Sequence, residues 1–242
     1  MNNTKRIGIF GGTFNPVHKG HLEAIRAVAQ AFDFEETYLI PAAIPPHKSG
    51  HEIASASDRM EMLRLALSEC SCLKKPVRIS DIELRRSGPS YTIDTVRHFK
   101  SLMPDMEICF ILGLDAFLEI NTWKSFNLLF GLVSFIVMNR AGFGVSFGRL
   151  NCRSVESCGD RETAFFKKIA LFLKKEISEA YEFSEERQCH IHPEKQPVYP
   201  FDADLPDISS TEIRRRIKEG RSIQFLTPET VASFIQKKGL FQ

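Results

Sequence analysis

The sequence predicts an α/β protein with a doubly wound, mostly parallel sheet, helices on both faces and a helical portion at the C-terminus. Short apolar runs alternate with amphipathic stretches of helical length from residue 7 to about residue 140, which is the pattern of a parallel sheet. The run EICFILG at 107–113 is almost continuously apolar, as expected of a central strand covered on both faces. Three stretches that could bind a ligand, 11–21, 45–48 and 113–115, each follow a predicted strand, and parallel sheets bind ligands at that edge.

Each predicted element has its own local pattern. Short apolar runs predict strands at 7–10, 37–42, 76–84, 107–113 and 133–140. Apolar residues spaced three or four apart predict helices over 18–32, from 57 or 58 to about 70, within 87–103, over 161–181, within 207–220 and within 226–241.

Residues typical of helix ends support these boundaries. Asp58 with Glu61 resembles a capping pair, and Ser209 with Glu212 forms a capping box. Glycines and a proline mark the other ends: Gly220 after the helix that begins at Ser209, and Thr227, Pro228 and Gly239 around the last helix.

The region between residues 141 and 200 has no matching pattern of strands. Residues 141–160 contain glycine and serine without a clear period, which predicts a long loop. The helix over 161–181 follows, with an apolar face formed by Phe165, Ile169, Phe172, Leu173 and Ile177. We therefore expect one domain, 1–242, with an insertion of a loop and a helix at about 141–200.

Composition excludes several classes of protein. With 32 basic and 30 acidic residues the net charge is +2, too even to indicate a surface for nucleic acid or membranes. No apolar run approaches the roughly 18 residues of a membrane span, and the N-terminus does not resemble a signal peptide. Six cysteines without a C-x-x-C pair indicate free thiols, with Cys109 buried in a strand, in a reducing compartment. We expect a cytoplasmic protein.

The stretch GGTFNPVHKGH at 11–21 places two glycines and two histidines where a strand passes into a helix. Gly11 and Gly12 let backbone amides approach a ligand closely. The helix beginning that follows offers N–H groups and a partial positive charge. His18 and His21, three residues apart, lie on one face of the first turn. Together these features predict an anion-binding site with two additional donors.

Other interpretations of this stretch fit less well. It lacks the lysine of a P-loop, and its glycines do not have the spacing of a dinucleotide-binding fingerprint. A metal site needs more ligands than two histidines, although His47 and His51 could join them. Taken alone, the stretch is also compatible with two satisfied surface histidines beside a glycine turn.

Two motifs resemble those of the nucleotidyltransferase superfamily. GGTFNPVHKGH resembles T/S-F-x-P-x-H-x-G-H, and ISSTEIRRRI at 208–217 resembles I-S-S-T-x-I-R. Within the superfamily, the stretches PPHK, SYTIDT, GLDAF with Trp123, and LTPETVASFI are similar to those of the bacterial nicotinate-nucleotide adenylyltransferase family. The resemblance covers residues 7–140 and 207–242 and implies a Rossmann-like fold.

The resemblance also implies a reaction and its residues. ATP and nicotinate mononucleotide would give nicotinate adenine dinucleotide and pyrophosphate, a step of NAD biosynthesis, with Mg²⁺ bound through the ATP phosphates as the cofactor. The implied catalytic residues are His18, His21 and Arg214. The implied ATP-binding residues are Gly11, Gly12, Thr13, Phe14, His18, His21, Gly113, Asp115, Ser209, Ser210, Thr211 and Arg214. The implied mononucleotide-binding residues are Asn15, His47, Lys48, Ser90, Tyr91, Thr92 and Trp123.

The chemistry of these residues agrees with that reaction. A 5′-phosphate is largely ionised at neutral pH, because its second pKa is about 6, so it attacks without a general base. The protein must align the reactants and stabilise charge on the phosphates. We therefore expect the histidine pair to bind phosphate rather than transfer protons. Arg214, three residues after Thr211, can reach the same phosphates, whereas Arg215 and Arg216 form a solvated face.

Several points stay open in the sequence. Asn15 stands where the family usually has Asp, and NRAGF at 139–143 replaces an expected R-P-G. Asp115 could serve as a helix cap, Trp123 as ordinary core and Lys48 as a solvated loop residue. Two alternative functions remain: a sibling enzyme acting on phosphopantetheine or nicotinamide mononucleotide, and a module that senses nucleotides without turnover.

Overall fold

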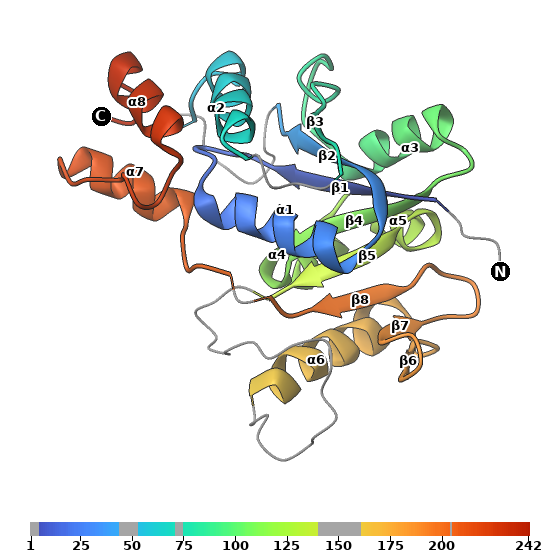
Figure 1. Ribbon diagram of the computed structural model, residues 1–242. Helices are drawn as coiled ribbons and strands as arrows, with labels where there is room; N and C mark the ends of the chain where they lie inside the picture. The colour runs from blue at the N-terminus through green and yellow to red at the C-terminus, as the bar shows by residue number, and fades with distance from the viewer. Residues whose placement is uncertain (1–4, 44–52, 71–74, 140–160, 204) are drawn as a thin grey trace. The chain divides into compact units, whose positions relative to one another are not determined.

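The computed structural model describes residues 5–43, 53–70, 75–139, 161–203 and 205–242 (Figure 1). The chain divides into two compact units, which we describe separately. The signature unit consists of Arg6–Ser90 and Pro206–Gln242, and the middle unit consists of Met1–Lys5 and Tyr91–Leu205. The expected organisation of 1–242 as one domain stays a prediction.

The signature unit contains parallel strands in the order β3-β2-β1, with helices beside them. Its strands are β1 (Arg6–Gly12), β2 (Phe34–Pro41) and β3 (Val77–Ile79). Its helices are α1 (Lys19–Ala31), α2 (Ala56–Ser68), α7 (Ser210–Lys218) and α8 (Glu229–Lys238). Gly12 lies opposite Pro41 in the ladder, so β1 and β2 end at the same edge.

Apolar faces and a few polar contacts hold the signature unit together. Helix α2 packs against β2, β3 and α8. Thr230, in the first turn of α8, donates its N–H to Oε1 of Glu69 at 2.7 Å and its hydroxyl to the carbonyl of Leu65 at 3.2 Å. These elements enclose an apolar core, whose largest fully buried apolar side chains are Ile7, Ile9, Phe14, Phe34, Leu39, Ile40 and Met62.

The middle unit contains strands in the order β4-β5-β8-β7-β6. Strands β4, β5 and β8 are parallel, whereas β7 and β6 are antiparallel to their neighbours. The strands are β4 (Glu107–Gly113), β5 (Ser134–Met138), β6 (Glu182–Ser184), β7 (Cys189–Ile191) and β8 (Val198–Phe201). The helices are α3 (Thr92–Leu102), α4 (Leu114–Leu118), η2 (Ile120–Thr122), α5 (Phe126–Leu132), α6 (Arg161–Phe172) and η3 (Leu173–Ile177).

Aromatic side chains fill the core of the middle unit. Phe130 packs on Phe135 with ring centroids 4.8 Å apart, and Phe117 contacts both rings from α4. Tyr181 is buried beside Phe130 and donates its hydroxyl hydrogen to the carbonyl of Gln196 at 3.0 Å. The continuous apolar run at 107–113 is buried at its centre, as a central parallel strand requires, and Cys109 within it is buried as expected.

The observed fold confirms the predicted class and corrects several details. It is a mostly parallel Rossmann-like α/β arrangement with flanking helices. The predicted strand at 76–84 is shorter, because only Val77–Ile79 pair with β2. The region predicted as a loop and a helix also contains β6, β7 and β8, whose three or four residues are too few for a periodic pattern. The stretch 141–160, with Cys152 and Cys158, lies outside the described residues, as does Arg140.

Two of the predicted helix beginnings lie at different residues. Helix α2 begins at Ala56 with Ser55 as its N-cap, whose Oγ accepts from the N–H of Asp58, so Asp58 lies inside the first turn. The last helix begins after Pro228, and the Thr227 side chain does not cap it. Ser209 and Gly239 occupy the predicted end positions.

In the part of the chain that the structure describes, no helix has the length and apolar character needed to cross a lipid bilayer.

Candidate active site

The turn between β1 and α1 has a tightly packed backbone. A Cβ on Gly12 would lie 3.0 Å from the ring of Phe14, so a side chain larger than hydrogen does not fit without movement. Phe14 has a φ of 49°, in the left-handed region that costs a non-glycine residue roughly 1–3 kcal/mol. Its ring is buried and makes edge contacts with Phe10 and His21. The turn therefore supports the ring of the second histidine.

The two histidines of the first motif form a stacked pair. Their ring centroids are 3.6 Å apart and their planes differ by 30°. His18 is the N-cap of α1 rather than a member of its first turn, and its backbone N–H donates to Nδ1 of His21 at 3.2 Å. Because Nδ1 of His21 accepts a hydrogen bond, the ring proton of neutral His21 resides on Nε2. Nε2 of His21 is thus a donor suited to an anion.

The second motif meets the first directly. Ser210 donates its hydroxyl hydrogen to the carbonyl oxygen of Pro16 at 2.9 Å. Arg214 donates from Nη1 to the carbonyl oxygen of Asn15, also at 2.9 Å. The two motifs are almost 200 residues apart in the sequence, and both lie in the signature unit. The beginning of α1, where the sequence predicts an anion site, and the beginning of α7 are therefore neighbours.

The donors at the two helix beginnings are partly engaged. The backbone N–H of Lys19, the first residue of α1, donates to the carbonyl of Leu226 at 2.9 Å. At the beginning of α7, Oγ of Ser209 accepts from the N–H of Glu212 at 3.1 Å. Since these N–H groups already have acceptors, an anion at either helix beginning would be bound by the other N–H groups of the two turns.

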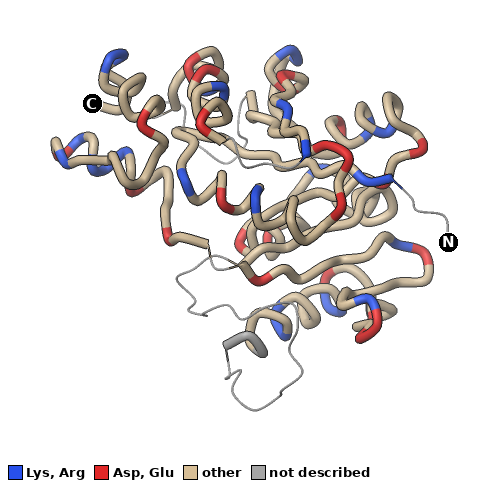
Figure 2. Tube along the Cα trace, in the orientation of Figure 1, with Lys and Arg blue, Asp and Glu red and all other residues tan. Residues whose placement is uncertain are grey.

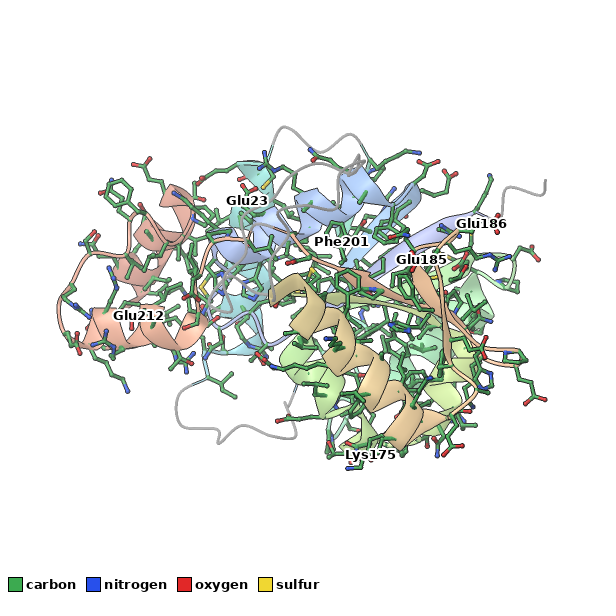
Figure 3. The ribbon with its side chains drawn as sticks, turned by 90° about the horizontal axis from the view of Figure 1, so that it is seen from below. Glu23, Lys175, Glu185, Glu186, Phe201 and Glu212 are labelled. Atoms are coloured by element: carbon green, nitrogen blue, oxygen red, sulfur yellow. The ribbon has the colours of Figure 1, made fainter. Side chains whose placement is uncertain are left out.

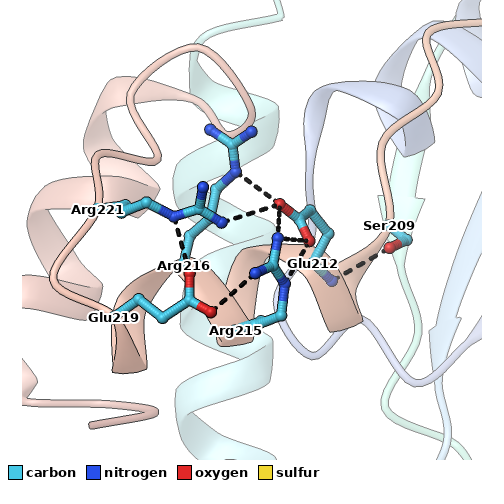
Figure 4. A network of polar contacts seen from close by, with 6 residues as sticks. All are labelled: Ser209, Glu212, Arg215, Arg216, Glu219 and Arg221. Atoms are coloured by element: carbon cyan, nitrogen blue, oxygen red, sulfur yellow. Dashed lines mark hydrogen bonds and ion pairs between the residues drawn. The ribbon is translucent and has the colours of Figure 1, made fainter.

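The arginines after Arg214 belong to a surface network, as predicted for Arg215 and Arg216. Glu212, labelled on α7 in Figure 3, accepts from Nε of Arg216 at 2.8 Å and from Nε of Arg215 at 2.9 Å (Figure 4). These hydrogen bonds lower the pKa of Glu212, the one from Arg216 most strongly. Basic and acidic residues lie side by side along α7 (Figure 2). Arg215 and Arg216 therefore pair with carboxylates of the same helix.

Two residues predicted to bind the mononucleotide make contacts with backbone in the signature unit. The side-chain oxygen of Asn15 accepts from the N–H of Ala54 at 2.9 Å, and the side chain is buried. Oγ of Ser90 accepts from the N–H of Ala43 at 2.8 Å. An Asp at position 15 could accept the same hydrogen bond, so the departure from the family pattern leaves this contact possible. His47 and Lys48 lie outside the described residues.

The remaining predicted site residues lie in the middle unit. Tyr91 is the N-cap of α3, and Lys124 places its Nζ 4.4 Å from the centre of the Tyr91 ring. Thr92 follows as the first residue of α3. Trp123, half-buried, meets the ring of Phe110 edge-on with centroids 6.1 Å apart.

Gly113 and Asp115 also belong to the middle unit. Gly113 ends β4 and is the N-cap of α4, and Asp115 is exposed in the first turn of that helix. Asp115 therefore lies inside the helix and is not its cap residue.

Arg59, which the sequence motifs did not predict, is fully buried at the beginning of α2 and donates to the carbonyl of Thr13 at 3.0 Å. The sequence contained a sign of this burial, because Arg59 lies on the apolar stripe of α2, with Leu63 and Ala66 at helical spacing.

Among the described residues, no group of three or more His, Cys, Asp or Glu side chains could hold a metal ion.

A Rossmann-like scaffold that brings a histidine pair and a serine-led helix beginning to one turn defines a nucleotidyltransferase. A family model described as cytidylyltransferase-like matches residues 9–216. The chain belongs to this family.

Similar proteins extend the match over nearly the whole chain. A protein of Desulfatibacillum aliphaticivorans, described as a probable nicotinate-nucleotide adenylyltransferase, is 37% identical over 98% of this chain and 99% of its own length. A protein of Desulfitobacterium hafniense with the same description is 36% identical over 98% and 96% of the two chains. The fold is similar to that of Plasmodium falciparum nicotinic acid mononucleotide adenylyltransferase complexed with NaAD, with a TM-score of 0.70 at 20% identity, covering 98% of this chain and 97% of that one.

Proposed function

We propose that this protein transfers AMP from ATP to nicotinate mononucleotide, forming nicotinate adenine dinucleotide and pyrophosphate, in the cytoplasm. The observation that carries the proposal is the direct contact of the two motifs, in which Ser210 and Arg214 donate to the carbonyls of Pro16 and Asn15 at 2.9 Å. The relatives described as probable nicotinate-nucleotide adenylyltransferases support the choice of substrate.

The proposed step is a direct displacement at phosphorus. A phosphate oxygen of the mononucleotide attacks the α-phosphorus of ATP, and pyrophosphate leaves with the electron pair of the bond that breaks. The attacking oxygen is already an anion, so the site has to align the reactants and stabilise charge. Nε2–H of His21 donates to an oxygen of the α-phosphoryl group, and the stacked ring of His18 keeps His21 in this orientation.

Arg214 and the beginning of α7 stabilise the leaving pyrophosphate in this proposal. The guanidinium lies beside the turn because the carbonyl of Asn15 accepts one of its hydrogens, and a guanidinium binds phosphate oxygens through a planar pair of donors. Thr211 is exposed in the first turn of α7, where its hydroxyl lies 3.4 Å from Nη2 of Arg214. Mg²⁺ would enter the site together with ATP, bound by the ATP phosphates and by water.

One assay tests the proposal. Pyrophosphate release from ATP and Mg²⁺ is measured with nicotinate mononucleotide, nicotinamide mononucleotide and phosphopantetheine offered separately at equal concentrations. We expect the highest kcat/KM with the carboxylate form of the pyridine mononucleotide. Equal values for the acid and the amide would overturn the substrate, and a higher value for phosphopantetheine would favour a sibling enzyme. Nucleotide binding without pyrophosphate release would indicate a sensing module.

A further inference from the structure

Arg59 is a buried cation whose hydrogen bonds all go to backbone in the described part of the chain. It lies in the first turn of α2 with only 1% of its surface exposed. Burial lowers its pKa, because a guanidinium that leaves water loses its hydration. No carboxylate of the described residues pairs with it. Its charge is offset by the dipoles of carbonyl groups.

The guanidinium of Arg59 joins three separate segments of backbone. Nε donates to the carbonyl of Ala54, just before α2, at 3.1 Å. Nη1 donates to the carbonyl of Thr13, in the turn after β1, at 3.0 Å. The third segment follows β2, where Nη1 reaches the carbonyl of Ala42 at 2.7 Å and Nη2 that of Ala43 at 3.3 Å. Four of the five donor hydrogens of the fork are thus used.

Two of these residues, Ala54 and Ala43, connect Arg59 to candidate site residues. Ala54 accepts from Arg59 with its carbonyl and donates its N–H to the side chain of Asn15. Ala43 accepts from Arg59 and donates its N–H to Oγ of Ser90. Asn15 and Ser90 are both assigned to the mononucleotide in our interpretation. Arg59 is therefore connected to Asn15 through Ala54 and to Ser90 through Ala43. In the sequence, Asn15 follows β1 and Ser90 follows β3.

Stability alone gives a weak reason for this arrangement. A buried cation loses its hydration, and this cost offsets much of what its hydrogen bonds contribute to stability. Met62, Leu63 and Ala66 occupy neighbouring buried positions of α2, so an apolar residue would continue the stripe. The planar guanidinium can donate to three backbone segments at once and so holds them at fixed positions relative to one another. An apolar side chain cannot do this.

We propose that Arg59 is a positioning residue for the mononucleotide, a role that rests on the proposed function. It fixes the turn after β1, the end of β2 and the residues before α2 relative to one another. Asn15 and Ser90 thereby keep the relative positions that bind the mononucleotide. Arg59 itself does not touch the reacting phosphates. Its loss should therefore affect recognition of the mononucleotide more than recognition of ATP, which we assign to His18, His21 and Arg214.

The test compares Arg59→Lys and Arg59→Met with Arg64→Met. Lysine keeps the charge but has no fork that spans three segments, and methionine keeps the apolar stem. Arg64 lies on the same helix, is exposed and pairs with Glu61, which makes it a matched control. We expect both Arg59 variants to fold by circular dichroism and to raise KM for nicotinate mononucleotide about 10- to 100-fold. KM for ATP should change less than about threefold, and Arg64→Met should match the wild type.

The kinetic constants distinguish a positioning role from a purely structural one. A fall in kcat with both KM values unchanged would mean fewer folded molecules and would overturn the proposal. An equal rise of both KM values, or failure of both variants to fold, would overturn it in favour of a general structural role. If the wild-type protein itself does not use nicotinate mononucleotide, the proposed function fails rather than the assignment of Arg59. An unchanged KM for the mononucleotide in an active Arg59→Met variant would also overturn the proposal.

Discussion

The ring of His18 lies so near Gly20 that a Cβ added there would contact it closely. An added Cβ would lie 3.0 Å from Nδ1 and 3.2 Å from Cε1 of His18. Because the ring is stacked on His21, it cannot move without disturbing the pair. We expect Gly20→Ala to lower kcat about tenfold or more, although alanine favours a helix over glycine by about 1 kcal/mol. Steady-state kinetics and the melting temperature measure the two effects separately.

Gly131→Ala is the matched control for this substitution. Gly131 lies in α5, and nothing is found within 4 Å of a Cβ added there. The control should keep its kcat and gain stability from helix propensity. A Gly20→Ala variant with the kcat of the wild type would show that the position of His18 does not matter for turnover.

Arg214 carries a second prediction at the residue scale. Its substitution by alanine removes a cation that lies beside the β1–α1 turn. A hydrogen bond to a charged group contributes about 1.5–3 kcal/mol, so kcat/KM for ATP should fall about 10- to 100-fold. Arg215→Ala, which removes a surface partner of Glu212, is the control and should leave kcat/KM for ATP unchanged. Initial rates over a range of ATP concentrations give these kinetic constants for both variants. Equal effects of the two substitutions would contradict a special role of Arg214.

Single residues differed in how well the sequence predicted their contacts. The contact of the second motif with the turn before His18 was expected, because both motifs have fixed spacing and a recognisable chemistry. The contacts of Arg59 with Thr13, Ala42 and Ala43 and the contact of Ser90 could not be expected, since these side chains meet backbone groups 16 to 47 residues away only after the chain has folded. No local pattern encodes such a hydrogen bond.

Elements were predictable in proportion to their length. The apolar spacing of α1, α3 and α6 repeats over several turns, and all three were found. Strands β6, β7 and β8 have three or four residues each, which is fewer than an alternation needs to stand out. Their position depends on pairing with one another and with β5, and such pairing is a property of the fold rather than of the local sequence.

His190, on strand β7, should make the stability of the protein depend on pH. His190 is buried on this strand, its Nε2 has no hydrogen-bond partner among the described residues, and Phe183 lies edge-on to its ring. Burial, and to a lesser degree the charge of Lys174, lower the pKa of His190 to about 4. The unfolded chain binds this proton with a pKa of about 6.5. Stability therefore falls as pH drops from about 6.5 to about 4, by about 3 kcal/mol for this group.

Urea unfolding at pH 7 and pH 4.5 measures this effect. His190→Phe removes the titrating group and keeps an aromatic ring beside Phe183, so the loss of stability between the two pH values should be smaller than in the wild type. His98→Gln, on α3, is a control that should lose as much stability as the wild type. Equal losses in His190→Phe and the wild type would show that His190 is not the residue responsible.

At the scale of the whole molecule, the predicted site residues are distributed over both units. Both motifs, Asn15 and Ser90 belong to the signature unit, whereas Tyr91, Thr92, Gly113, Asp115 and Trp123 belong to the middle unit. The convergence of the two motifs could be expected from their resemblance to one family. The division of the chain could not, because the boundary at Ser90 and Tyr91 falls inside the single stretch SYTIDT, where composition does not change.

This division makes a prediction for ATP binding. If the phosphates are held by the two helix beginnings of the signature unit, ATP with Mg²⁺ should slow amide hydrogen exchange at 13–21 and 209–214. At a hundredfold excess over Kd, ligand binding contributes about 2.7 kcal/mol to stability, so amides that exchange through opening of this unit should slow about 100-fold. Mass spectrometry of peptic peptides resolves these segments. Arg214→Ala measured at the same ATP concentration should show less protection at both segments, because its hydrogen bond to Asn15 links them. Protection of 13–21 without any change at 209–214 would mean that the second helix beginning does not take part in binding the phosphates.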